Sequence, residues 1–134
     1  MKSTNKKYTK TYLKKQARIL KRKQLVAWSN SVKERDNHTC QICGIKVGEF
    51  TKNGKKVVFN SHHIFSKEGI YSFLMFDINN GITLCQNCHR FSRSNSPHRQ
   101  EFVFFVWFMK NKPKQFEYLK QKILTNNEEK QLNS

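Results

Sequence analysis

Apolar residues near the start of the chain are spaced as on an α-helix. They recur at helical intervals in two groups: Leu13, Ala17 and Leu20, then Leu25, Trp28 and Val32. This spacing predicts a helical arm that packs one face while Lys and Arg cover the rest. Ser31-x-x-Glu34 has the form of a capping box, so we expect the arm to break into two helices near residues 29–31. We expect Trp28 to be a core anchor rather than a base-stacking residue, and the first ten residues to be disordered when nothing is bound.

The pattern changes to that of short strands in the centre of the chain. Asn53-Gly54 is a strong tight-turn signal between the segments 49–51 and 57–59, and together they predict a β-hairpin. The pair His62-His63 then falls near the end of the second strand of this hairpin. The apolar segment 69–76 fits a short helix or a packed loop. It is followed by a turn-rich loop over 77–81 and a short strand over 82–84.

The last third of the chain has helical spacing again. A helix is expected to start at Cys88-His89, and two more are predicted over 100–111 and 113–124. The polar residues from Asn126 onward predict a frayed tail. We therefore divide the chain into a basic helical arm (1–27), a central core (28–98), C-terminal helices that pack on the core (99–125) and a disordered tail (126–134).

The net charge of +17 comes from 26 basic and 9 acidic residues, and no acidic residue precedes Glu34. A polyanion is the expected partner, because each Lys or Arg placed against a phosphate releases condensed counterions. The alternative is a solubilising arm that touches nothing, but so one-sided a run costs self-repulsion unless an anion balances it. An anionic membrane fits less well, since the arm has too few large apolar residues to form a buried face. The candidate nucleic-acid contacts in the arm are Lys14, Lys15, Arg18 and Arg22.

Two Cys-x-x-Cys pairs, Cys40/Cys43 and Cys85/Cys88, have the spacing of a structural zinc site with four thiolate ligands. Two disulfides are the alternative, but the chain shows no apolar signal segment, and secreted scaffolds usually scatter their cysteines. A redox role is weak, because neither pair lies in a strand-to-helix redox context. The apolar run 102–109 is far short of the ~20 residues of a membrane span. We therefore expect a cytoplasmic protein with reduced thiols.

A zinc ion with four sulfur ligands has no open position, so the nearby histidines are free to form a second site. The cysteines and these histidines lie in three successive motifs. The motifs are Arg35-Asp36-Asn37-x-x-Cys40-x-x-Cys43-Gly44, His62-His63-Ile64 and Asn80-Gly81-Ile82-Thr83-Leu84-Cys85-x-x-Cys88-His89. In this order and spacing, the segment from about Trp28 to about Phe91 resembles the zinc-containing subgroup of the HNH endonuclease family. The stretch 96–107 is similar to the end of some phage-encoded HNH proteins.

The resemblance implies an α+β fold with a small ββα-metal (His-Me finger) core, pinned by the four-cysteine structural zinc and flanked by N-terminal and C-terminal helices. One catalytic divalent ion, such as Mg²⁺, Mn²⁺, Ni²⁺ or Zn²⁺, would lie between the hairpin and the helix. Carried over by position, His62 and His89 are metal ligands and His63 is the general base. Adjacent residues on a strand point to opposite faces, which agrees with separate tasks for the two neighbours. Asn80 is implied to orient His63; alternatively, it is a turn residue.

A third metal ligand is harder to place. The family often has one a helical turn after His89, but Arg93 holds that position and cannot bind a cation. We take His98 as the substitute, with a surface position as the alternative, because imidazole is the commonest metal-binding side chain. Arg90 and Arg93 are interpreted as phosphate contacts.

The predicted function is therefore metal-dependent hydrolysis of DNA phosphodiester bonds, by nicking or double-strand cleavage, in a protein from a phage or another mobile element. This chemistry needs a nucleophilic water, a base and positive charge near the phosphate. The alternative is a non-catalytic, zinc-stabilised nucleic-acid-binding module, which accounts for the cysteines and the arm but not for the histidines. DNA is the expected partner, a membrane is not, and we expect a monomer or weak homodimer. The pattern does not distinguish a homing endonuclease from a packaging, restriction or host-degrading enzyme.

Overall fold

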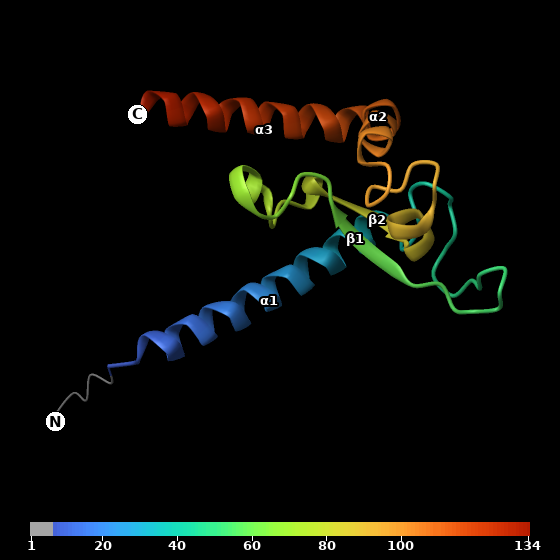
Figure 1. Ribbon diagram of the computed structural model, residues 1–134, viewed down its shortest axis with the longest axis horizontal. Helices are drawn as coiled ribbons and strands as arrows, with labels where there is room; N and C mark the ends of the chain where they lie inside the picture. Colours follow the sequence, from blue (N-terminus) through green and yellow to red (C-terminus); the bar gives the residue numbers. More distant parts are fainter. Residues whose placement is uncertain (1–6) are drawn as a thin grey trace.

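The computed structural model describes residues 7–134. Its elements follow the order α1 (Lys10–Arg35), β1 (Phe59–His63), η1 (Gly69–Leu74), η2 (Ile78–Asn80), β2 (Gly81–Cys85), η3 (Asn87–Phe91), α2 (Glu101–Asn111) and α3 (Pro113–Leu132). Here η1 and η2 are 3-10 helices and η3 is a single π-helical turn. The long helices α1 and α3 extend from the centre toward the same side (Figure 1). The fold is α+β, as the sequence predicts.

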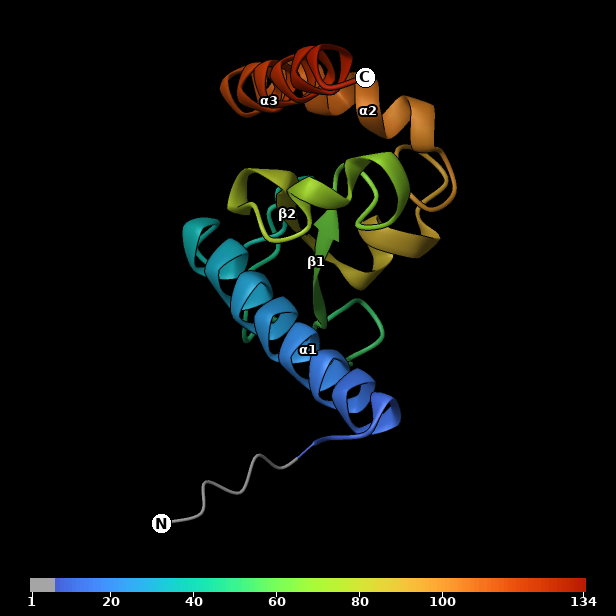
Figure 2. The ribbon, with the colours of Figure 1, turned by 90° about the vertical axis from the view of Figure 1, so that its left-hand side faces the viewer.

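The sheet consists of the antiparallel strands β1 and β2, and it lies between α1 on one side and α2 and α3 on the other (Figure 2). Phe59 pairs with Cys85 at one end, and His63 pairs with Gly81 at the other. The second cysteine pair therefore follows one end of the two-stranded ladder, and the histidine pair lies at the opposite end.

The hairpin predicted over 49–59 forms only around its turn, where Val57 N donates to Glu49 O at 3.1 Å, and the prediction that its second strand carries the histidines is wrong. An isolated bridge joins Phe50 to Lys56 around the Asn53-Gly54 turn, where Gly54 has a φ of 73°. The strand that carries the histidines pairs instead with β2, whose residues are all buried. Residues 49–56 are exposed and rich in lysine, so pairing with them would remove little apolar surface from water.

Helix α1 is continuous, so the break predicted near residues 29–31 is wrong. Thr9 caps its first turn by accepting a hydrogen bond from a backbone N–H at 3.2 Å, and no Gly or Pro interrupts the helix. Ser29 does not end a helix but donates to Ser61 Oγ on β1 at 2.9 Å. The helix starts at Lys10, inside the segment predicted to be disordered, while residues 1–6 of that segment lie outside the described residues.

The C-terminal end of α1 is tied to β2. Arg35 donates to the carbonyl oxygens of Ile78 and Gly81, each at 2.7 Å. The neighbouring Asp36 pairs with Arg35 at 2.9 Å and accepts from Thr83 N at 2.8 Å. These hydrogen bonds join the residues just before the first cysteine pair to the strand that leads into the second.

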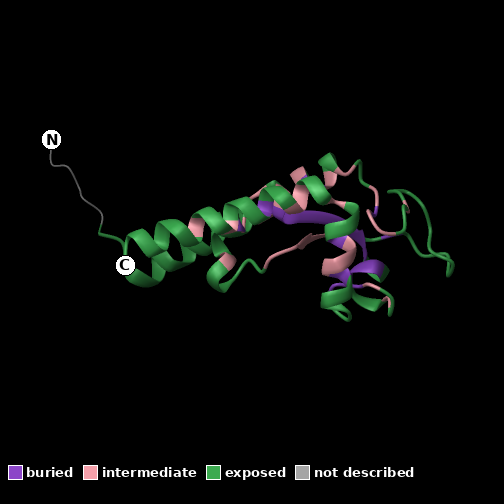
Figure 3. Ribbon diagram, turned by 90° about the horizontal axis from the view of Figure 1, so that it is seen from above, coloured by how far each residue is buried: buried purple, intermediate pink, exposed green. Residues whose placement is uncertain are grey.

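The two apolar groups of α1 do not share one face, and the prediction that the whole arm packs is wrong for its first half. At 100° per residue, the first group is centred about 90° around the helix from the second. The side chains of Trp28 and Val32 are 5% and 0% exposed, whereas those of Leu13 and Leu20 are 52% and 59% exposed. The exposed colour accordingly covers most of both long helices, and buried residues gather at the sheet (Figure 3).

The core forms where the sheet meets α2 and α3. Its buried residues are Cys40, Val57, Leu74, Ile82, Leu84, Cys85, Cys88, Phe104, Phe108 and Leu119. On the other face of the sheet, α1 approaches Gly81 so closely that a Cβ there would lie 2.5 Å from Val32 and 2.6 Å from Trp28. A glycine is therefore required where α1 crosses the start of β2.

Helix α3 runs through Leu132, so the frayed tail predicted from Asn126 is wrong for residues up to 132. That segment contains the strong helix formers Glu, Lys, Gln and Leu and lacks Gly and Pro, which explains why the helix continues. Pro113 occupies the first turn, where its missing N–H has no cost. Within residues 7–134, no helix is both long enough and apolar enough to cross a membrane.

Candidate active site

Three histidines from separate elements meet beside the sheet. His62 belongs to β1, His89 to η3, and His98 to the loop before α2. The Nε2 atom of His89 lies 3.2 Å from Nδ1 of His62 and 2.9 Å from Nε2 of His98, and the three candidate ligand atoms all lie within 4.8 Å of one another. The intervening loop is folded back by Ser96, whose hydroxyl donates to the carbonyl oxygen of His89 at 2.7 Å. The arrangement places three imidazole nitrogens where one metal ion could join them.

His63, the next residue on β1, is held in a different way. Its ring stacks on Trp28, with 3.8 Å between ring centroids and 10° between the planes. Its Nε2 lies 2.9 Å from the carbonyl oxygen of Met75. A carbonyl can only accept, so Nε2 carries the hydrogen, and Nδ1 of the neutral ring keeps a free lone pair. His62 and His63 both line a hollow of about 520 Å³.

The loop that carries Met75 is held by Asn80, whose side chain is fully buried. Its amide nitrogen donates to the carbonyl oxygens of Phe65 at 3.0 Å and Leu74 at 3.1 Å. Its amide oxygen accepts from Phe65 N at 2.8 Å. Three hydrogen bonds from one side chain thus hold both ends of the segment that leads from β1 to Met75, whose carbonyl oxygen contacts His63.

The four cysteines form a second cluster, and all are free thiols. Their sulfur atoms lie within 4.8 Å of one another, and Sγ of Cys43 is 3.7 Å from Sγ of Cys85. A hydrogen bond from Cys88 lowers the pKa of the Cys40 thiol to about 4, whereas burial raises the pKa of Cys43 to about 11. A thiolate at Cys40 is therefore favoured, whereas Cys43 needs a cation to ionise beside it, which is what zinc provides. The cluster could hold zinc.

Residues 40–93 match the family model described as HNH endonuclease. The match supports the resemblance of this segment to the HNH endonuclease family. It contains both cysteine pairs as well as His62, His63 and His89, and it ends before His98. HNH nucleases act on DNA and use divalent metal ions. Comparisons with curated proteins and with solved structures gave no match.

Burial sets the protonation of the three clustered histidines and of His63. Burial is the largest cause, and together with neighbouring imidazoles and Arg90 it lowers the pKa of His62 to about 3 and that of His89 to about 4. The pKa of His98 is also lowered, again mainly by burial. Burial lowers the pKa of His63 as well, although its hydrogen bond to a backbone carbonyl opposes the shift. The rings are therefore neutral near pH 7, the form that binds a metal or accepts a proton.

The charged side chains that line the hollow beside His62 and His63 differ in part from the predicted ones. Arg90 lines it together with His98, whereas Arg93 is exposed and lies outside its lining residues. The sequence reasoning missed Lys67 and Glu101, which also line it. Glu101 is the first residue of α2 and follows His98 by three residues, and the short distance along the chain between a carboxylate and a candidate ligand was the signal that could have found it.

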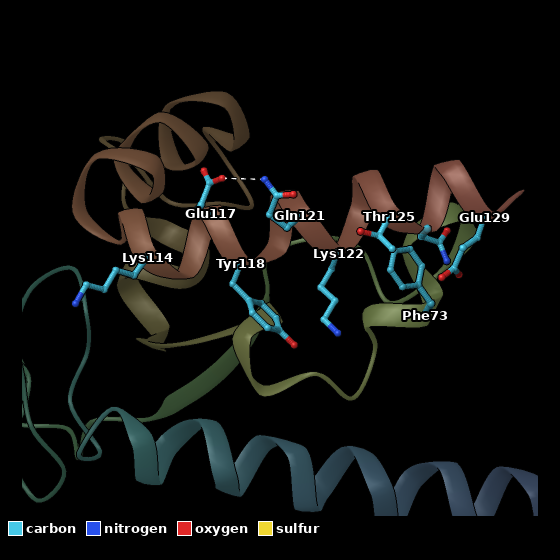
Figure 4. A pocket seen from close by; sticks show the side chains of 9 residues that line it. Phe73, Lys114, Glu117, Tyr118, Gln121, Lys122, Thr125 and Glu129 are labelled. Atoms are coloured by element: carbon cyan, nitrogen blue, oxygen red, sulfur yellow. Dashed lines mark hydrogen bonds between the residues drawn. The ribbon is translucent and has the colours of Figure 1, made fainter. Parts of the chain in front are cut away.

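A different hollow, of about 690 Å³, runs along α3 (Figure 4). Its lining is a row of charged, amide and hydroxyl side chains on α3, with Phe73 of η1 at one end beside Thr125 and Glu129. The Tyr118 hydroxyl there donates to Asp77 at 2.8 Å, and Lys122 lies 5.5 Å from the centre of the Tyr118 ring. None of the clustered histidines or cysteines lines this hollow, so the candidate chemistry lies elsewhere.

Proposed function

We propose that the protein is a metal-dependent endonuclease that cuts or nicks DNA. The observation that carries this proposal is the convergence of His62, His89 and His98 beside His63, within and next to a segment that matches the model of a nuclease family. A binding module that uses its cysteines for folding would need no such group of neutral imidazoles next to a hollow of about 520 Å³.

The donor set fits a divalent cation. Nitrogen atoms of three neutral imidazoles face one another in two close pairs. Without a cation, each pair can share at most one hydrogen atom between its two nitrogens. His62, His89 and His98 would hold the ion, and the remaining positions would stay open to water and substrate oxygens. A bound divalent ion would supply positive charge for the negative charge that develops on the phosphoryl and leaving oxygens.

His63 is the proposed general base. With Nε2 bonded to Met75 O, the lone pair of Nδ1 is free to take a proton from the attacking water. The stacked Trp28 ring and the carbonyl together restrict the imidazole to one orientation. Asn80 acts as a positioning residue, because its hydrogen bonds hold the loop that supplies the carbonyl.

Exposed basic residues on α1 are proposed to hold the DNA backbone. Lys14, Lys15, Arg18 and Arg22 are all exposed. Arg18 and Arg22 precede Ser29 by eleven and seven residues, so each lies within about 20° of Ser29 around the helix axis. Because Ser29 bonds to β1 one residue before His62, the basic face continues along the side of α1 that meets the catalytic strand.

Arg90 in the hollow and the exposed Arg93 are proposed as further phosphate contacts, and zinc at the four cysteines as the structural ion. In this proposal the arm 1–27 binds DNA, 28–98 is the nuclease core and the helices from 99 support it. An origin in a phage or mobile element and a cytoplasmic location stay predictions from the sequence.

The test is incubation of the purified protein with supercoiled plasmid in Mg²⁺, Mn²⁺, Ni²⁺ or Zn²⁺, alongside calorimetric titration with Mn²⁺. His63→Ala should keep metal and DNA binding but lose cleavage by the ~10²–10⁴-fold typical of removing a general base. His62→Ala and His89→Ala should lose the metal as well, and His98→Ala should weaken its binding. Nicked, linear and smeared products distinguish nicking, site-specific and non-specific cutting.

Two results would contradict the proposal. Cleavage by His63→Ala at the wild-type rate would rule out its role as base. If wild type bound DNA but cleaved it with none of the four metals, the protein would be the non-catalytic binding module.

A further inference from the structure

A hollow of about 710 Å³ lies next to the cysteine cluster, and η3 separates it from the histidines. Arg90 of η3 lines the histidine hollow, whereas Asn87 and Phe91 of the same turn line this one. The lysine-rich loop after the first cysteine pair forms another wall with Lys52, Lys55 and Lys56. Among the described residues that line it, none is acidic. The two hollows therefore adjoin through a single turn of chain, and both are basic.

An aromatic ring is exposed inside this basic hollow. Phe91 is 57% exposed although the core is close by, and the neighbouring wall residue Val58 is 55% exposed. Asn87 and Gln86 add amide groups that can donate and accept hydrogen bonds. Lysines that track phosphates beside an open aromatic face are the features with which proteins bind unpaired nucleotides. A paired base has both faces covered by its neighbours in the duplex and offers none to Phe91.

The lysine wall is shaped by a tight turn. Thr51 N donates to Lys55 O at 2.7 Å, Gly54 N donates to Thr51 O at 2.9 Å, and Thr51 Oγ1 accepts from Lys55 N at 3.2 Å. The loop projects from the side of the molecule opposite the free end of α1 (Figure 1). A DNA strand that crosses the histidines thus meets basic residues in both directions, α1 on one side and this loop on the other.

We propose that this hollow binds an unpaired nucleotide of the DNA strand next to the phosphodiester at the histidine site, with Phe91 stacking on the base and the lysines holding its phosphates. The proposal rests on the proposed function and narrows its substrate class to DNA with a single-stranded tail, gap or flap beside the cut. The lysines have a competing explanation, which is that they balance the negative charge of four thiolates around zinc.

The experiment compares the zinc-loaded full chain on two fluorescent DNAs, a blunt duplex and the same duplex with a short single-stranded tail, by anisotropy without added divalent metal. Phe91→Ala should weaken binding of the tailed duplex about 5- to 150-fold, the loss typical of removing one base–aromatic stack, and weaken blunt-duplex binding less. The matched control is Phe102→Ala, at a phenylalanine that is 79% exposed and lies outside both hollows; it should leave the ratio of the two affinities unchanged.

A second variant tests the lysines. Replacing Lys52, Lys55 and Lys56 by Gln should lower the slope of log affinity against log salt on the tailed duplex by about 2 to 3, at 0.7–0.9 for each phosphate contact. The matched control removes the same charge from α2 and α3 at Lys110, Lys120 and Lys130. Zinc content and melting temperature should stay at the wild-type values in both triple variants.

Three outcomes would overturn the inference: equal wild-type affinity for blunt and tailed duplexes, no effect of Phe91→Ala, or loss of zinc from the lysine variant with unchanged DNA affinity. The last would establish the thiolate-balancing role. Cleavage of supercoiled plasmid and of the tailed duplex with each of the four metals is measured separately, so the two proposals fail separately. A protein that cleaves plasmid without preferring tails refutes this inference alone, and one that prefers tails without cleaving anything refutes the nuclease proposal alone.

Discussion

The basic face of α1 offers a quantitative test of DNA binding. Replacing Lys14, Lys15, Arg18 and Arg22 by Gln removes four exposed charges without touching the buried contacts of the helix. Each Lys or Arg that neutralises a phosphate of duplex DNA contributes about 0.9 to the negative slope of log affinity against log salt. Four contacts therefore account for a slope change of about 3.6.

This slope change sets the size of the effect. Over a fourfold rise in salt, from about 50 to about 200 mM, wild-type affinity should fall about 150-fold more than that of the variant, so the two converge at high salt. The measurement is fluorescence anisotropy with a labelled blunt duplex at several salt concentrations. A variant with four glutamines at Lys110, Lys114, Lys120 and Lys130 has the same net charge and serves as the control.

The argument fails if the α1 variant keeps the wild-type slope, or if the control loses as much slope as the α1 variant. The first result would mean that α1 touches no phosphate. The second would mean that binding follows net charge and not the basic face that runs along α1 toward β1. Circular dichroism should show the same helix content in both variants, since Gln is nearly as good a helix former as Lys or Arg.

Three further predictions concern the fold. Cys85→Ser should unfold or aggregate the protein, because in a small zinc domain metal binding is largely folding free energy; a folded, fully active, zinc-free variant would refute the structural role. Gly81→Ala should cost about 2 kcal/mol or more in urea unfolding, because its Cβ would lie 2.5 Å from Val32, and an unchanged midpoint would show that α1 moves away freely. Asn80→Ala removes three hydrogen bonds of a buried amide and should lower stability by about 3 kcal/mol, as checked by thermal unfolding.

Residue type and spacing were enough to predict which side chains belong together in the centre of the chain. The two Cys-x-x-Cys pairs each form a local knuckle, so their geometry depends on few residues, and the structure brings all four sulfurs within 4.8 Å of one another. Neighbouring strand residues point to opposite faces by backbone geometry alone. This is why separate environments could be expected for His62 and His63 before any tertiary contact was known, whereas the grouping of His62 with His89 was implied by the family resemblance.

Tertiary structure decided what lay beyond such local rules. Whether β1 pairs with 49–51 or with 81–85 depends on how much apolar surface each pairing buries, and the buried β2 prevails over an exposed lysine-rich turn. His98 reaches His89 because a buried Ser96 folds the intervening loop back, a contact that no periodicity encodes. The unpacked first half of α1 has the same origin. A helical repeat sets which residues share a face, but only the position of the sheet determines how much of that face is covered.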